Sequence, residues 1–138
     1  MVKTAGTSAV DARTVLVVED SPTQALHLQV LLEQEGLNVV LAEDGRIGLE
    51  IAQQVQPDLI ILDLQMPEMN GFQVCRRLKD EDRTAFIPVI MFTRHDDREA
   101  IVLGLQLGAV DYIPKDAFAD AVLLETLRQM GLIVSRAV

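Results

Sequence analysis

The sequence predicts an α/β fold in which one parallel sheet is covered on both faces by helices. Five short apolar runs alternate with five longer amphipathic stretches, and such alternation implies right-handed crossovers between parallel strands. In addition, the run at 59–62 is apolar at every position, as expected for a central strand that is buried on both faces. We therefore expect a doubly wound sheet of five parallel strands and five helices.

The strands are identified by short runs rich in valine, isoleucine and leucine. They are expected at 14–18, 38–42, 59–62, 89–92 and 109–113. The helices are identified by apolar spacing and by the residues at their ends. Ser21 and Pro22 open the first helix, and Gly36 ends it. Asp44 caps the second helix, which ends before Pro57. The other three helices are expected at 72–78, 96–107 and 116–130.

The composition fits one globular domain. The chain has 138 residues, of which 49% are hydrophobic, and this content argues against wholesale disorder. We expect the domain to span residues 14–131, between a flexible arm at 1–13 and a tail or truncated linker at 132–138. The single cysteine excludes a disulfide within one chain.

Charge and hydropathy exclude two classes of partner. The formal net charge is −9, and a field of that sign repels phosphate backbones, so direct binding to nucleic acid is not expected. No apolar run approaches the ~18–20 residues that a membrane span requires. The N-terminal residues show no secretory signal, and we expect a cytoplasmic protein without a membrane partner.

Charged and hydroxyl side chains stand directly after four of the predicted strands. Glu19 and Asp20 follow the first strand, and Asp63 follows the third. Thr93 follows the fourth and Lys115 the fifth. In a doubly wound sheet these four strands lie adjacent, and ligands bind at the carboxyl ends of the strands. We therefore expect the five side chains to converge on one rim of the sheet.

The residue types at this rim indicate phosphoryl transfer to an aspartate. Three carboxylates in one cleft repel one another, and a divalent cation relieves the repulsion. Oxygen ligands with spare water positions suit Mg²⁺, and a carboxylate beside such a cation can act as a nucleophile. Lys115 and Thr93 can then stabilise the charge on the transferred phosphoryl group. The five residues thus include the groups required to phosphorylate Asp63.

The motifs at these strand ends resemble those of the receiver domains of two-component response regulators. They are Val18-Glu19-Asp20-Ser21-Pro22, Ile61-Leu62-Asp63-Leu64-Gln65-Met66-Pro67-Glu68-Met69-Asn70-Gly71, Met91-Phe92-Thr93, and Gly108-Ala109 followed by Asp111-Tyr112 and Lys115. The resemblance covers residues 14–131 and is closest to single-domain chemotaxis regulators. It implies a flavodoxin-like sheet with strand order 2-1-3-4-5.

The resemblance also implies how the site works. Glu19, Asp20 and Asp63 would hold Mg²⁺ or Mn²⁺ together with the backbone carbonyl of Gln65. Asp63 would accept a phosphoryl group from a sensor histidine kinase, a histidine phosphotransfer protein or a small donor such as acetyl phosphate. Lys115 would pair with that group. The domain would catalyse its own phosphorylation and dephosphorylation without being a turnover enzyme.

The resemblance further assigns residues that transmit the change or set its duration. Thr93 and Tyr112 would be switch residues that repack the surface of the fourth helix, fifth strand and fifth helix. That surface would control a partner or an output domain, and would pair two copies on phosphorylation. Gln65, Arg94 and His95 stand at positions that tune the rate of dephosphorylation. Arg94 departs from the family, which usually has a small residue there.

A second departure concerns the lysine. Lys115 follows Pro114 and precedes Asp116, whereas the family usually has a proline directly after the lysine. His27 and His95 are interpreted as surface residues and Cys75 as a buried hydrophobe. The charged run at 79–83 is interpreted as a solvated helix end.

Two other functions are compatible with the predicted fold. One is an interaction module that signals without phosphorylation, although the intact set of five rim residues argues against it. The other is a phosphotransfer or phosphatase enzyme of the haloacid dehalogenase type. Such enzymes need a second acid two residues after the nucleophile, and Gln65 at that position has no acid–base capacity.

Overall fold

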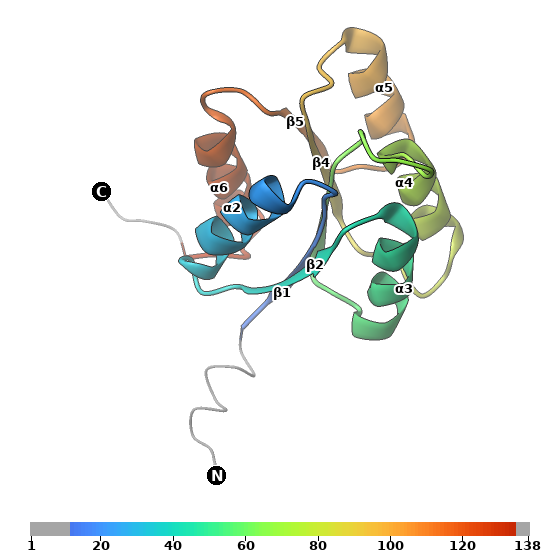
Figure 1. Cartoon of the computed structure of the whole chain (residues 1–138). Coiled ribbons are helices and arrows are strands. Elements are labelled where there is room, and N and C mark those ends of the chain that lie inside the picture. Colours follow the sequence, from blue (N-terminus) through green and yellow to red (C-terminus); the bar gives the residue numbers. More distant parts are fainter. Residues whose placement is uncertain (1–11, 135–138) are drawn as a thin grey trace.

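The computed structural model describes residues 12–134 and shows a parallel sheet wrapped by helices (Figure 1). The strands lie in the order β2-β1-β3-β4-β5, and each neighbouring pair is parallel. This confirms the predicted doubly wound, flavodoxin-like architecture. The elements in chain order are β1 (Thr14–Val18), α2 (Pro22–Glu33), β2 (Asn38–Ala42), α3 (Gly45–Val55), β3 (Leu59–Leu62), α4 (Gly71–Asp80), β4 (Val89–Thr93), α5 (Arg98–Gln106), β5 (Asp111–Pro114) and α6 (Ala119–Gln129).

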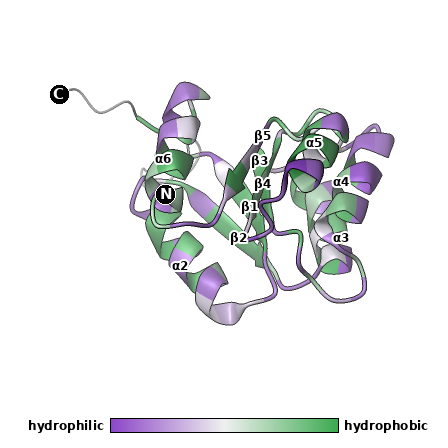
Figure 2. Cartoon of the chain, turned by 90° about the horizontal axis from the view of Figure 1, so that it is seen from above, coloured by the Kyte–Doolittle hydropathy of each residue, from purple (hydrophilic) through white to green (hydrophobic). Residues whose placement is uncertain are grey.

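Helices α2 and α6 cover one face of the sheet, and α3, α4 and α5 cover the other (Figures 1 and 2). Because successive strand residues point to opposite faces, each central strand serves two cores. In β1, Leu16 and Val18 join the core under α3–α5, whereas Val15 and Val17 face α2 and α6. All four residues of β3 are buried in the same way. None of the helices between residues 12 and 134 is long and apolar enough to cross a membrane.

Side chains cap the first turns of α2 and α3. Ser21 Oγ accepts a hydrogen bond from the amide of Gln24 at 3.3 Å, and Asp44 Oδ1 accepts one from Ile47 at 2.8 Å. These bonds satisfy N–H groups that have no partner within the helix. Gly36 follows α2 with a φ of 88°, a left-handed conformation that glycine adopts without strain.

The fifth strand is shorter at its start than the sequence predicts. It begins at Asp111 rather than at 109, because Ala109 takes part in the turn that ends the preceding helix. The amide of Ala109 donates to the carbonyl of Gly104 at 3.2 Å, and Gly108 has a φ of 107°. This is the hydrogen-bonded turn that commonly terminates a helix.

The last helix begins later than predicted. It starts at Ala119 rather than at Asp116. The Asp116 carboxylate accepts a hydrogen bond from the amide of Phe118 at 2.8 Å, which closes a turn before the helix. Aspartate favours such local turns over the interior of a helix.

The charged run at 79–83 is exposed at residues 80–83, as predicted, whereas Lys79 and part of the expected tail pack against the domain. Lys79 Nζ donates to the carbonyls of Ala85 and Ile87 at 3.0 and 2.8 Å, so its charged end binds backbone rather than water. Ile133, in the expected tail, is only 7% exposed and joins the core under α2 and α6. The expected arm up to residue 11, and the tail from residue 135, lie outside the described residues.

Candidate functional site

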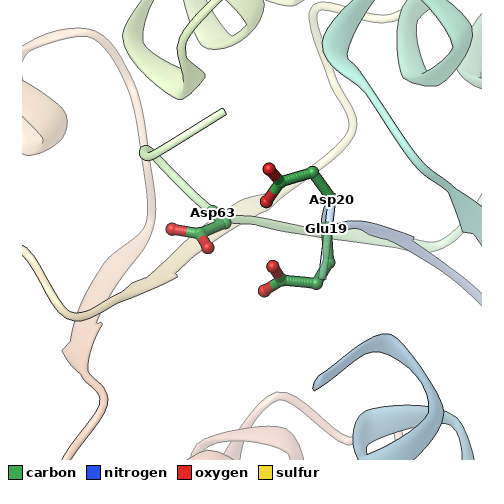
Figure 3. A group of neighbouring side chains, drawn as sticks. All are labelled: Glu19, Asp20 and Asp63. Atoms are coloured by element: carbon green, nitrogen blue, oxygen red, sulfur yellow. The ribbon is translucent and has the colours of Figure 1, made fainter. Parts of the chain in front are cut away.

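Acidic side chains from two neighbouring strands meet at the carboxyl edge of the sheet (Figure 3). Glu19 and Asp20 follow β1, and Asp63 follows β3. One carboxylate oxygen from each residue lies within 4.8 Å of those of the other two. Glu19 and Asp63 are buried, whereas Asp20 is exposed, so the cluster is open to solvent at Asp20.

This carboxylate cluster has the ligands that a hard divalent cation uses. Three carboxylates converge, and the exposed Asp20 leaves room for water, which suits Mg²⁺ or Mn²⁺. The amide of Gln65 donates to Asp63 Oδ1 at 3.2 Å, which brings the Gln65 backbone beside the cluster. The donor set therefore fits the cation implied by the sequence.

The ammonium group of Lys115 bridges the cluster. Its Nζ donates to Glu19 Oε1 at 2.7 Å and to Asp63 Oδ2 at 3.2 Å. Its third partner is the side-chain oxygen of Gln24. Only 11% of the Lys115 side chain is exposed. The backbone amide of Lys115 donates to the carbonyl of Thr93 at 2.7 Å, which fixes the lysine to the end of β4.

The Glu19 carboxylate is placed where negative charge is costly. Burial raises the pKa of Glu19 above its ordinary value, and the charge of Asp63 acts in the same direction. The hydrogen bond from Lys115 opposes both effects. The amide of Ser21 adds a second donor, to Glu19 Oε2 at 3.1 Å. Fixed donors thus hold an anion that burial alone would disfavour.

The two predicted switch residues share one neighbour. Thr93 is fully buried, and its hydroxyl accepts a hydrogen bond from the amide of His95 at 3.3 Å. Tyr112 is 7% exposed, and its hydroxyl donates to the carbonyl of His95. Both hydroxyl groups are therefore tied to the backbone of the segment that follows β4, with the Tyr112 ring already turned inward.

The predicted rate-tuning residues surround the cluster at its surface. Gln65 and Arg94 are exposed, and His95 is half-buried. His95 Nε2 lies 2.7 Å from Asp97 Oδ2. Arg94 and Gln24 both line a pocket of about 350 Å³ between α2 and α6. Arg94 thus stands at a cavity that adjoins the site rather than inside the acidic cluster.

Gln24 is a member of the site that sequence reasoning missed. It stands three residues after Ser21, and a glutamine in that position is ordinarily explained by helix capping. Its position in the sequence could have indicated that it belongs to the site. Gln24 lies in the first turn of the helix that follows Glu19 and Asp20, and a helix that follows a parallel strand starts at the carboxyl edge of the sheet.

Comparison with known sequences identifies the family. The chain matches the response regulator receiver domain over residues 15–128. It is 39% identical over 109 residues to protein PilH of Pseudomonas aeruginosa, an alignment that covers 79% of this chain and 90% of that protein. It is 42% identical over 101 residues to the DNA-binding regulator RpaA of Synechocystis. That alignment covers 73% of this chain but only 42% of RpaA, so the chain spans less than half of that relative.

Solved structures that resemble this chain are also receiver domains and chemotaxis regulators. The chemotaxis protein CheY4 of Vibrio cholerae superposes with a TM-score of 0.79 at 32% identity, covering 86% of this chain and 98% of that chain. The receiver domain of a histidine kinase from Syntrophus aciditrophicus gives a TM-score of 0.78 at 38% identity, covering 92% and 97%. The fold and the acidic site define a receiver domain, and the chain belongs to the response regulator receiver family.

Proposed function

We propose that this receiver domain is a phosphorylation-dependent signalling switch whose phosphoryl acceptor is Asp63. The observation that supports this most directly is the position of the Lys115 ammonium group. It is bonded to Asp63 Oδ2 at 3.2 Å and to Glu19 Oε1 at 2.7 Å. A cation held there can pair with an oxygen of a phosphoryl group on Asp63.

Glu19, Asp20 and Asp63 would hold Mg²⁺ or Mn²⁺ together with the backbone carbonyl of Gln65. Bound there, the cation would neutralise charge on the carboxylates and on the phosphoryl oxygens. The fold contributes by bringing one carboxylate oxygen of each residue within 4.8 Å of the other two. Lys115 offsets part of the repulsion that this arrangement creates.

The transfer step forms a bond between an Asp63 oxygen and the phosphorus of the donor. With a phosphohistidine donor the P–N bond breaks, and its electron pair stays on the imidazole. With acetyl phosphate a P–O bond breaks and acetate leaves. Lys115 donates a hydrogen bond to one phosphoryl oxygen, and the Thr93 hydroxyl donates to another. The domain thereby catalyses its own phosphorylation. In dephosphorylation, water attacks the phosphorus, the bond to the Asp63 oxygen breaks, and inorganic phosphate leaves while the carboxylate is restored, so the domain is not a turnover enzyme in the usual sense.

The structural change would spread from Thr93 through His95. In the described structure the His95 amide donates to Thr93 Oγ1, and the His95 carbonyl accepts from Tyr112. When Thr93 turns to a phosphoryl oxygen it releases that amide, and the segment that Tyr112 contacts loses one of these two hydrogen bonds. Tyr112 belongs to β5, so the surface of α5, β5 and α6 would change and be read by a partner or an output domain.

Gln65, Arg94 and His95 would set how long the phosphoryl group lasts. Gln65 and Arg94 are exposed, so they can meet incoming water or a phosphatase. Arg94 adds a positive charge where it lines the pocket next to Lys115.

The donor would be a sensor histidine kinase or a histidine phosphotransfer protein in the cytoplasm. RpaA is a DNA-binding regulator, but the net charge of −9 on this chain disfavours nucleic acid. We therefore expect its output to pass through proteins, including a second phosphorylated copy.

The decisive experiment is intact mass spectrometry after incubation with acetyl phosphate. We expect one added phosphoryl group with Mg²⁺ present, little with EDTA, and none in Asp63→Asn. Asp82→Asn removes an exposed carboxylate elsewhere and should behave like the wild type.

A phosphoryl group retained by Asp63→Asn would refute the acceptor assignment. An unmodified wild-type protein, both with acetyl phosphate and with a panel of phosphorylated histidine kinases, would instead favour the interaction module that signals without phosphorylation.

A further inference from the structure

Gln24 lies in the first turn of α2, and its side-chain oxygen contacts the ammonium group of Lys115. A lysine ammonium group has three N–H donors and no acceptor. Glu19 Oε1 and Asp63 Oδ2 accept two of these hydrogens, at 2.7 and 3.2 Å, and Gln24 Oε1 accepts the third. We propose that Gln24 is a positioning residue that holds Lys115 over Asp63 for phosphoryl transfer, an inference that rests on the function proposed above.

The start of α2 leaves the Gln24 side chain free for this contact. Gln73 stands at the equivalent position of α4, and its side chain closes a capping box by accepting from the Asn70 amide at 2.9 Å. In α2 the corresponding amide, that of Ser21, donates to Glu19 Oε2 at 3.1 Å instead. The helix start is therefore complete without the Gln24 side chain, which reaches the lysine.

Among the three oxygens that contact the Lys115 ammonium group, only that of Gln24 has no other part in the proposed reaction. Glu19 and Asp63 belong to the proposed cation site, and Asp63 is also the phosphoryl acceptor, so both change partners during transfer. The Gln24 oxygen can stay on the lysine throughout. Because an amide is neutral, it adds no repulsion against an incoming phosphoryl donor.

A pocket beside Lys115 explains why the contact with Gln24 matters. Lys115 and Gln24 both line the pocket of about 350 Å³ between α2 and α6. The lysine side chain is a flexible four-carbon stem, and this pocket offers it space away from Asp63. The Gln24 oxygen holds the ammonium group on the side of the carboxylates.

The test compares Gln24→Met, which keeps the side-chain length and removes the oxygen, with the wild type. We expect phosphorylation by acetyl phosphate to slow about tenfold, the size typical of one lost hydrogen bond to a charged group. A second readout is the ¹⁵N NMR signal of the Lys115 ammonium group in the unphosphorylated protein. Lys3 and Lys79 are the other lysines, so Lys115→Arg assigns the signal. Its protection from exchange should fall in Gln24→Met.

Two further variants separate positioning from a general structural effect. Gln24→Glu restores an oxygen but adds a negative charge. We expect the Lys115 signal to regain its protection while phosphorylation stays slow, because the new carboxylate repels the donor. Gln29→Met makes the same replacement on the same helix, where the amide donates to Glu33 at 3.3 Å, and should match the wild type in both readouts.

The outcomes distinguish this inference from the proposed function. Slow phosphorylation and a less protected Lys115 in Gln24→Met would support the positioning role. A Gln24→Met protein that equals the wild type in both readouts would overturn this inference alone. A wild-type protein that takes up no phosphoryl group from any donor would overturn the proposed function and this inference together.

Discussion

Tyr112 shows how one residue links the acidic site to the fold. It is buried in the core under α3–α5, yet its hydroxyl reaches the backbone of His95 beside the site. Burial raises the pKa of Tyr112 from 10.0 to about 12, and the negative charges of Asp97, Asp96 and Asp63 add to the shift. The phenol is therefore held neutral and able to donate its hydrogen bond.

The shift in the pKa of Tyr112 can be measured directly by absorbance, because the chain has one tyrosine and no tryptophan. We expect the absorbance of ionised phenol to appear near pH 12 in the folded protein and near pH 10 in urea. Because the folded pKa is the higher one, this stabilisation is complete below about pH 10 and is lost as the pH rises through 12. A native midpoint equal to that in urea would show that Tyr112 is not buried as described.

For single residues, the sequence predicts which side chains come together at the site, but not which hydrogen bonds they form there. Glu19, Asp20, Asp63 and Lys115 were expected at one rim because parallel strands end at a common edge, and the structure brings them together. The orientation of a hydroxyl is not encoded in such spacing, and Thr93 bonds to His95 in this structure. The sequence did not predict Gln24 as a site residue, because a glutamine at this position is also common in helix capping.

At the scale of elements, α4 begins against the backbone of Asp63, the proposed phosphoryl acceptor. A Cβ added at Gly71 would lie 2.5 Å from the carbonyl oxygen of Asp63 and 2.9 Å from the Cα of Leu64. Glycine-to-alanine changes in helices usually stabilise. Gly71→Ala should instead lower the free energy of unfolding by about 1–3 kcal/mol, as overpacking does, in urea titrations. Arg76→Ala, at an exposed position of α4, should change it by less than about 0.5 kcal/mol. If Gly71→Ala left the free energy of unfolding unchanged, Gly71 would lie farther from the backbone of Asp63 and Leu64 than described.

The strands were easier to predict than the ends of the last elements. Buried strands such as β1 and β3 are apolar runs whose limits are visible in the sequence. The start of β5 depended on a helix-terminating turn that extends to Ala109. The start of α6 depended on a local bond between Asp116 and Phe118. Both are decided by individual hydrogen bonds, which leave no periodic pattern.

At the scale of the whole molecule, the doubly wound topology separates the acidic site from the surface that we propose changes on phosphorylation. The carboxylate cluster occupies the end of β1 and β3 (Figure 3), whereas β5 and its flanking helices form one edge of the sheet (Figure 1). Thr93 ends β4, which lies between β3 and β5, and Tyr112 belongs to β5. A charge added at Asp63 can therefore alter a distant surface through a short chain of contacts.

That edge carries apolar side chains that a second copy could cover. Val102, Leu103 and Leu105 of α5 and Val110 before β5 are each at least 39% exposed. We expect the protein treated with beryllofluoride, a mimic of the phosphoryl group, to sediment as a dimer and the untreated protein as a monomer. Leu105→Asp should prevent dimerisation by burying a charge at the interface. Val55→Asp, at a similarly exposed position of α3, should not. Equal sedimentation of treated and untreated wild type would contradict pairing on phosphorylation, and a dimer that survives Leu105→Asp would place the contact elsewhere.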